Sequence, residues 1–569
     1  MKNLKKALSF ILVCCSLFPM VGCVREGYTI DPKKTQVYVG NYYMGLRDAW
    51  LQDAKTRFEE EYKDYVNGSK TGVEVVIDNG QYADTALLNH LRSSRDTVFF
   101  SESINYYTYL EEGVLADVTD IVTETLTEYG EERSIEQKMS QTMVDYFKVD
   151  GEKYYGLPFY EASASIAYDI DLFEDNRLYL AKNGCPSEAY MEGGSFNSGY
   201  KYTSGLEGTA PKSAGPDGVY ETGDDGLPAT YEEFYAMCKN MRKKGITPLI
   251  WPGAHQDYFN DYASALWADY EGLEQMSINY TLTGKAKNLI SVDEQGNIQK
   301  LPELEINNEN GKELVKQAGR YYALNFVRSV ITDTDFYDFL SISESQSHLD
   351  SQNDFLYGRF SNSKATVAML LDGTWWDSEA NDTYLLMEST YGAAAAKVNR
   401  RIGLLPLPKA TQEQVGKKQT NIILKNSLGF VNAKAATDSV SLELAKAFLQ
   451  FCHTDESLEA FTKIQNMPKP YTYEVSNEAK AEMSRFGKDL YEMHCNTDYV
   501  FPLSQNPLVL SNANKFMPLY AWDTKIGTTT ESLVTNVFRY NKAVTAKDYF
   551  DGLYKERESS WSTDFSRFF

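Results

Sequence analysis

Two adjacent tryptophans are the residues of this chain best suited to hold a ligand. Trp375 and Trp376 follow Asp372-Gly373, and the preceding stretch, 364–371, has the apolar composition of a buried strand. A sugar ring packs its C–H face on an aromatic ring, while its rim of hydroxyls needs fixed donors and acceptors. The pair therefore predicts a saccharide-stacking platform in which one ring faces the ligand and the other packs inside. We favour Trp375 as the ring that faces the ligand.

Further aromatic and polar side chains are expected at strand ends or where the chain crosses between parts of the fold. Hydroxyl partners for a sugar are expected from Ser101, Glu102 and Asp372, because each lies at the end of a predicted strand. Core packing is an equal alternative for Trp251, and a solvated hinge charge is the alternative for Glu161. The predicted ligand-binding residues are Tyr43, Ser101, Glu102, Tyr160, Glu161, Trp251, Asp372, Trp375, Trp376 and Trp522.

An acidic, glycine-rich loop at 215–226 is the other feature with chemical potential. Asp217, Asp224 and Asp225 could supply the charge that calcium needs among its six to eight oxygen ligands. The spacing departs from the EF-hand pattern, because Val219 stands where an acidic or amide residue is required. The loop predicts a structural calcium ion, and an acidic surface turn is the alternative.

The elements that must position these residues begin with an alternation of strand and helix patterns. Strands are expected near 37–39, 73–77 and 97–100, and helices at 46–62, 82–93 and 106–112. This order predicts a parallel sheet wrapped by helices, with ligands at the carboxyl ends of the strands. Later helices are expected at 231–244 after a Thr230 cap, 313–330 and 441–452. Extended crossings are expected at 155–168, which leads into a second lobe, and at 402–406 and 428–431.

Length and composition limit the classes of protein to which the chain can belong. With 569 residues, 43% of them hydrophobic, it builds more than one domain or one two-lobed unit. The formal net charge of −24 argues against a nucleic-acid partner and against adhesion of the protein body to anionic lipid. Five histidines argue against a histidine-based metal enzyme, whereas 41 tyrosines suit sugar binding.

The N-terminus has the parts of an export signal. Basic residues, including Lys2, precede an apolar run at 7–18, and Gly22-Cys23 follows. Because the run is shorter than the about 20 residues that span a membrane, residues 1–22 are predicted to be a signal peptide. Cleavage before Cys23 and attachment of lipid to its thiol would leave 23–35 as a tether. The alternative is an ordinary secreted protein.

Four cysteines beyond the signal region, Cys185, Cys238, Cys452 and Cys495, are far apart in the chain. They contain no C-x-x-C pair, so neither a zinc ribbon nor a thioredoxin motif is present. Two disulfides and buried free thiols are equal alternatives for these four cysteines.

Four segments in order resemble the extracellular solute-binding proteins of ABC importers. They are the strand exit and helix at 41–62, the passages 98–119 and 155–173, and the stretch 365–376, and the resemblance extends over residues 36–480. It is to family 1, the carbohydrate-type lipoproteins of Gram-positive bacteria.

The resemblance implies an α/β, periplasmic-binding-protein-like fold with two lobes, each a mostly parallel sheet with flanking helices, joined by several hinge crossings. It assigns 36–160 and 425–480 to lobe I, and 161–405 and 485–569 to lobe II, with an insertion at 183–230. It implies that a monomer, lipid-anchored at the extracellular face of the cytoplasmic membrane, captures an oligosaccharide between the lobes. The sugar would pass unaltered to the transmembrane permease subunits of the importer.

Two rival functions stay open from the sequence. No P-loop, H-E-x-x-H or G-x-S-x-G motif occurs. A glycoside hydrolase needs only a pair of carboxylates, and the sequence does not exclude such a pair among its 80 acidic residues. An exported, lipid-anchored hydrolase is therefore one alternative. A solute-binding sensor for a non-sugar ligand is the other.

Overall fold

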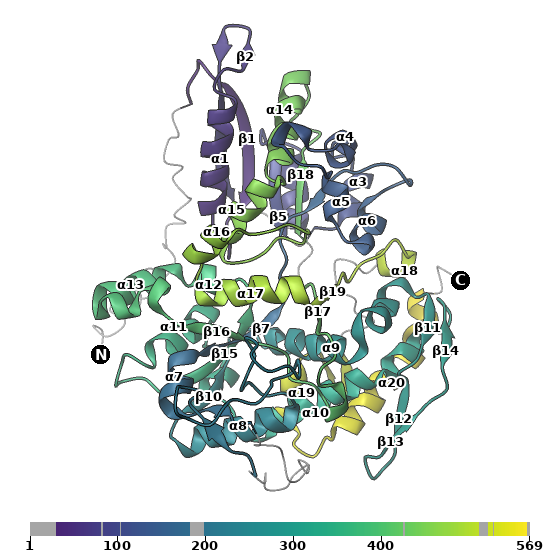
Figure 1. Cartoon of the computed structure of the whole chain (residues 1–569). Coiled ribbons are helices and arrows are strands. Elements are labelled where there is room, and N and C mark those ends of the chain that lie inside the picture. The colour runs from purple at the N-terminus through teal and green to yellow at the C-terminus, as the bar shows by residue number, and fades with distance from the viewer. Residues whose placement is uncertain are drawn as a thin grey trace, which may run out of the picture.

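Two lobes, each built on one central sheet, are stacked one above the other in the computed structural model (Figure 1). The structure describes residues 30–80, 84–102, 104–182, 199–424, 427–510, 522–526 and 529–565. The predicted signal peptide, Cys23 and residues 183–198 of the predicted insertion lie outside the described residues.

Lobe I has a five-stranded sheet in the order β4-β1-β5-β18-β6. Its strands are β4 (Val73–Gly80), β1 (Thr35–Tyr42), β5 (Val98–Glu102), β18 (Ser427–Val431) and β6 (Leu157–Pro158). β1 is parallel to β4 and β5, whereas β18 is antiparallel to both of its neighbours. The sheet is therefore mixed. Since β6 runs in the direction of β1 and β5 and leads into lobe II, β1 and β5 also end on the side that faces lobe II.

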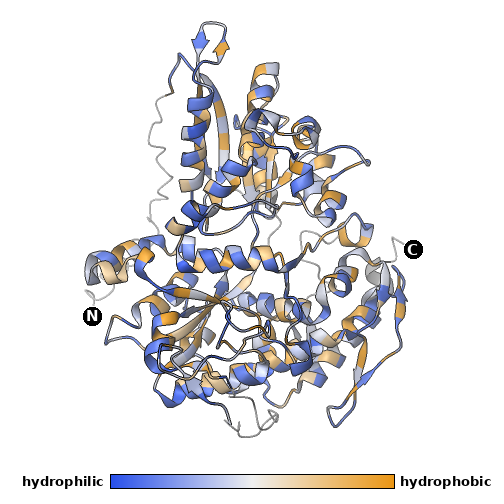
Figure 2. Ribbon diagram, in the orientation of Figure 1, coloured by the Kyte–Doolittle hydropathy of each residue, from blue (hydrophilic) through white to orange (hydrophobic). Residues whose placement is uncertain are grey.

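The helices of lobe I follow the sequence pattern. α1 (Ala49–Glu61) buries Trp50, Ala54 and Phe58, which recur every four residues along one face. Figure 2 shows this helix mostly blue on the outside of the lobe, whereas the strands behind it are mostly orange. The other helices here are α2 (Asp84–Leu91), α3 (Tyr106–Glu111), α4 (Thr119–Thr123), α5 (Ile135–Lys138), α6 (Gln141–Phe147), α14 (Ser439–Phe451), α15 (Asp455–Gln465) and α16 (Asn477–Glu482).

Lobe II has a four-stranded sheet in the order β10-β15-β7-β16. Its strands are β10 (Thr247–Ile250), β15 (Val367–Gly373), β7 (Ala164–Asp169) and β16 (Ile402–Leu405), and all their residues are buried. β10 and β15 are parallel, and β7 is antiparallel to β15 and β16. Because β7 enters from lobe I and runs away from it, β15 ends on the side that faces lobe I.

Helices cover both faces of this second sheet. α8 (Tyr231–Lys243) begins as predicted after Thr230, whose hydroxyl accepts a hydrogen bond from the amide of Glu233. α9 (Asp257–Thr281) is kinked at Gly272, where φ is 76°. The remaining helices are α7 (Ile170–Asn176), α10 (Ala318–Thr332), α11 (His348–Tyr357), α12 (Trp376–Glu379), α13 (Asn381–Tyr391), α17 (Arg485–Asn496), α18 (Pro507–Leu510), α19 (Val534–Tyr540) and α20 (Ala546–Phe565).

Short elements complete the described fold. Two-stranded pairs are formed by β2 (Val66–Asn67) with β3 (Lys70–Thr71), β8 (Tyr179–Leu180) with β9 (Tyr202–Thr203), β11 (Gly284–Ala286) with β14 (Leu304–Ile306), β12 (Ile290–Val292) with β13 (Ile298–Lys300), β17 (Thr420–Ile422) with β19 (Asp498–Val500), and β20 (Thr524–Ile526) with β21 (Thr529–Glu531). Among the residues that the structure describes, no helix combines the length and apolar character that crossing a membrane requires.

The chain crosses into lobe II within the predicted crossing at 155–168, but two other predicted crossings are strands of the sheets. The predicted crossings at 402–406 and 428–431 are instead the sheet strands β16 and β18. The chain passes into lobe II at 159–163, between β6 and β7, returns to lobe I before β18, and crosses again between α16 and α17. The first two connections lie side by side, since the amide of Leu424 donates to the carbonyl of Ala162 at 2.8 Å.

Candidate functional site

The two tryptophans after β15 have different environments. Trp376 is 0% exposed and packs edge-on against Phe355 and Phe486, at 5.9 and 5.2 Å between ring centres. Trp375 is only partly buried. The structure thus gives Trp375 the outward position that the sequence favours, and its contact with a ligand stays a prediction.

Trp375 lies where the two lobes meet. Its indole covers Gly373, where a Cβ atom would come within 2.1 Å of the ring, so this position requires glycine. Tyr258, at the start of α9, packs against the indole with its ring centre at 5.9 Å and an interplanar angle of 66°. From lobe I, the loop after β1 approaches so closely that a Cβ atom on Gly45 would lie 4.0 Å from Cδ1 of Trp375.

A network of acceptors lies beside this aromatic pair. Asp372, 1% exposed, and Glu379 both accept hydrogen bonds from Nε2 of Gln352, at 3.1 and 2.8 Å. Burial, and then the charge of Glu379, raise the pKa of Asp372 well above its usual value. Burial, and then Asp372 and Glu379, likewise raise the pKa of Tyr258. His348 completes the network, with Nε2 at 3.5 Å from Glu379.

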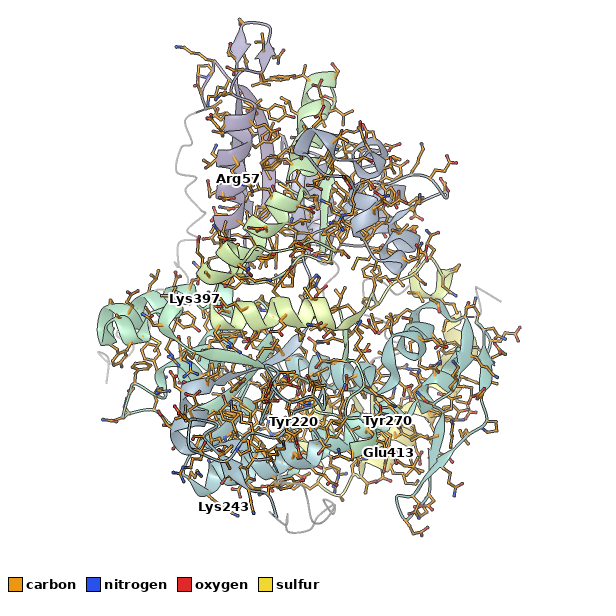
Figure 3. The ribbon with its side chains drawn as sticks, viewed as in Figure 1. Arg57, Tyr220, Lys243, Tyr270, Lys397 and Glu413 are labelled. Carbon is orange, nitrogen blue, oxygen red and sulfur yellow. The ribbon has the colours of Figure 1, made fainter. Side chains whose placement is uncertain are left out.

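α12 is fixed firmly enough to hold Trp375 and Glu379 in place. Lys397, labelled in Figure 3 at the level where the lobes meet, pairs with the buried carboxylate of Asp377 at 3.0 Å. The same carboxylate accepts a hydrogen bond from Ser484 of α17 at 2.9 Å. Two elements far apart in the sequence therefore orient the helix that begins after Trp375.

Hydroxyl and carboxylate groups gather at the strand ends of lobe I. The hydroxyl of Tyr160 donates to Glu102 at the end of β5. Burial, and then the charge of Glu102, raise the pKa of Tyr42 at the end of β1 to about 12. Ser101 is buried in β5. The structure thus brings the predicted residues Glu102 and Tyr160 together, whereas Ser101, the preceding residue of the strand, points to the opposite face of the sheet.

The loop after β1 also reaches across to lobe II. Tyr43 is half-buried. Burial lowers the pKa of Arg47, but Asp382 and then Tyr43 outweigh it and raise the pKa. The guanidinium of Arg47 pairs with Asp382 of α13 at 2.7 Å. An ion pair therefore joins the lobes next to the aromatic pair.

Glu161 is a hinge residue and not a surface charge. It is 5% exposed, and its Oε1 lies 3.2 Å from Nδ1 of His494 in α17. The other ring nitrogen of His494 lies 3.1 Å from the carbonyl oxygen of Tyr471. This cluster joins a lobe crossing to two later segments, and contact of Glu161 with a ligand stays a prediction.

Two of the predicted ligand-binding tryptophans are core residues. Trp251 is 0% exposed and packs between Phe259 and Tyr337. Trp522 is buried too, and its indole donates to the carbonyl of Asn260. The prediction that these two rings face a ligand is wrong for this structure, because helix α9 covers the strand end that Trp251 follows.

The acidic loop holds its carboxylates in local hydrogen bonds. Asp217 accepts from the amide of Val219 at 2.7 Å, Asp224 from the amide of Asp217 at 3.1 Å, and Asp225 from the amide of Glu221 at 2.9 Å. Within the described part of the chain, no group of three or more His, Cys, Asp and Glu side chains is arranged to hold a metal ion. In this arrangement the three carboxylates do not converge on one point, and calcium here stays a prediction.

The described cysteines are free thiols. Cys238 and Cys452 are buried, and burial raises the pKa of Cys452 to about 12. Cys495 is free and exposed, while Cys185 lies outside the described residues. For these three thiols, the structure favours the free-thiol alternative over disulfides.

Five residues of the site were missed by sequence reasoning: Arg47, Tyr258, His348, Gln352 and Glu379. Tyr258 had a usable signal, because it follows β10 and opens a helix, the same topological position as Tyr43. Gln352 and Glu379 had none, since their role arises only when α11 and α12 pack side by side under β15.

Comparison with protein families gives one match. Residues 55–485 match the family described as bacterial extracellular solute-binding protein. No match was found among curated proteins.

Solved structures of the same architecture are known. RafE in complex with raffinose is 15% identical with a TM-score of 0.51, covering 92% of this chain and 98% of its own. Maltose-bound T. maritima MalE3 is 14% identical with a TM-score of 0.51, covering 92% and 99%. A chitin oligosaccharide binding protein is 16% identical with a TM-score of 0.51, covering 93% and 100%. At these identities the likeness establishes the two-lobed fold.

Proposed function

Because this chain belongs to the bacterial extracellular solute-binding protein family, we propose that it captures an oligosaccharide between its lobes for an ABC importer. The solute passes to the transmembrane permease subunits chemically unchanged. Lobe closure around the sugar expels water and creates the form that the permease reads.

The observation that carries this proposal is the position of Trp375. Its ring reaches the surface at the junction of the lobes, against Tyr258 of lobe II and opposite Gly45 of lobe I. Two aromatic rings set at an angle offer stacking faces for consecutive sugar units. Carboxyl and hydroxyl groups beside them, including Glu379 and Glu102, suit sugar hydroxyls as hydrogen-bond acceptors.

The compared structures support the choice of a saccharide. Their recorded ligands or names are raffinose, maltose and chitin oligosaccharide. Family membership makes the protein a binding protein and not an enzyme, so the glycoside hydrolase alternative is not retained. A sensor role stays the rival, and it predicts a membrane kinase in place of a permease as the partner.

Anchoring through Cys23 is a separate part of the proposal. Lipid on this thiol would hold the protein at the extracellular face of the cytoplasmic membrane. Replacing Cys23 with Ala should release the protein from cell membranes into the medium, and retention of the variant on membranes would refute the anchor.

A thermal-shift screen over a panel of glycans, followed by calorimetric titration of the hits, tests the proposed function. At least one oligosaccharide should raise the melting temperature, and Trp375→Ala should weaken its binding at least tenfold. Tyr540→Ala, which removes an exposed aromatic ring from lobe II, is the matched control and should bind as the wild type does. Unchanged affinity in Trp375→Ala would remove this ring from the site.

A further inference from the structure

The proposed cleft carries several carboxyl groups, and the charged side chains that the structure describes beside them are already paired. On lobe II, Asp372 and Glu379 share the single amide donor of Gln352. On lobe I, Glu102 accepts from the hydroxyl of Tyr160. Each of these groups is a carboxyl, and each lies within the cluster that surrounds the aromatic pair or at the strand ends opposite it.

Among the described residues, the arginine and the histidine nearest this cluster already lie beside carboxylates. Arg47, the guanidinium on the lobe I loop, is paired with Asp382 at 2.7 Å. His348 lies 3.5 Å from Glu379, and its other ring neighbour is His255 at 5.8 Å. An anionic ligand would therefore have to displace Asp382 before it could pair with Arg47.

We infer that the cleft selects an uncharged oligosaccharide and rejects an anionic one, with Glu379 as a specificity-determining residue. This inference rests on the proposed function. A sugar hydroxyl donates a hydrogen bond to a carboxylate and is bound favourably. A sugar carboxylate at the same place brings two like charges together in a partly desolvated site, which repels it.

Gln352 has a positioning role in this selection. Its Nε2 group spans Asp372 and Glu379, and its Oε1 is buried without a hydrogen-bond partner. Its amide is thus committed to holding the two carboxyl groups side by side. Both acids lie near Tyr258, since burial and then the charges of Asp372 and Glu379 raise the pKa of its hydroxyl.

The test uses full-length soluble protein and pairs of oligosaccharides that differ only in charge. Neutral trisaccharides of glucose, galactose, mannose and N-acetylglucosamine are titrated beside trigalacturonic acid and trimannuronic acid. The best neutral ligand is then compared with its derivative oxidised to the carboxylate at C6. Wild-type protein should bind the oxidised form at least tenfold more weakly, which corresponds to about 1.4 kcal/mol.

Glu379→Gln should shrink this discrimination at least threefold, because it removes the repelling charge and keeps the side-chain size. Glu388→Gln, an exposed position on α13, is the matched control and should leave the ratio unchanged. Equal or tighter binding of an acidic trisaccharide by the wild type would overturn the inference while upholding a saccharide receptor. Binding of no saccharide would overturn the proposed function and the inference with it.

Discussion

His494 is expected to stabilise the hinge only while its ring is protonated. Its Nδ1 lies 3.2 Å from Oε1 of Glu161, and its Nε2 lies 3.1 Å from the carbonyl oxygen of Tyr471. Both partners are acceptors, and a neutral imidazole carries a single N–H, so only the imidazolium satisfies both contacts. Burial lowers the pKa of His494, but the charge of Glu161 and the hydrogen bond to it outweigh burial and raise the pKa above its usual value.

The perturbation that isolates this effect is His494→Gln. Glutamine keeps a donor for Glu161 and removes the positive charge. Since hydrogen bonds to charged groups contribute about 1.5–3 kcal/mol, the variant should lose that much free energy of unfolding at pH 5.5. Because the pKa is raised on folding, the contribution is fully present below the unfolded value near 6.5 and disappears as pH rises through the folded value. At pH 9 the difference from wild type should therefore fall below about 1 kcal/mol.

Urea unfolding followed by far-UV circular dichroism at pH 5.5 and pH 9 measures this difference. His255→Gln, which changes an exposed histidine, is the control and should follow the wild type at both pH values. A loss that is the same at both pH values, or larger at pH 9, would show that the ring acts through packing and not through charge.

Three further outcomes are expected. Trp376→Ala should lower the free energy of unfolding by about 3–5 kcal/mol, because Trp376 is wholly buried and its removal leaves a cavity. Trp375→Ala should lower it by less than half as much. Equal losses in urea titrations would contradict the assignment of one core ring and one outward ring. The ammonium of Lys469 is buried among four aromatic rings, and burial lowers its pKa to about 8. Folding thus favours neutral lysine, so the stability of wild type relative to Lys469→Met should rise by about 3 kcal/mol between pH 8 and 10.5, and a flat difference would refute this reasoning. Calcium at the 215–226 loop, proposed from the sequence, should raise the melting temperature of the demetallated protein. Burial and then Asp217 raise the pKa of Asp224 to about 6, so calcium binding should weaken below that pH. A calorimetric titration with calcium that shows no heat at pH 7 would refute the site.

The sheet strands were largely predictable because their signals are local. Val37 and Val39 in β1 alternate as a strand with one buried face must. The strands β16 and β18 were misassigned as crossings, because a short apolar run does not reveal which strands will pair beside it. The sequence pattern also did not predict that β7 and β18 run antiparallel to their neighbours, since strand direction depends on connections that span much of the chain.

The site was predictable only in part, and for a related reason. Trp375 could be found because a strand end, a glycine and an aromatic residue are adjacent in the sequence. Trp251 follows a strand as well, yet the first turns of α9 bury it. Tyr258 and Gln352 reach the same cluster from separate helices, and only tertiary packing brings them to Trp375.

Hydrogen bonds between the first two lobe connections constrain how the lobes can move. The amide of Leu424 donates to the carbonyl of Ala162, and Ser427 both donates to and accepts from the backbone of Tyr160. With the third connection between α16 and α17, such a joint favours rotation about one axis over twisting or sliding. A single hinge angle then describes the closure of the lobes, so one pair of fluorescent labels, one on each lobe, would follow the movement from the ligand-free to the ligand-bound form.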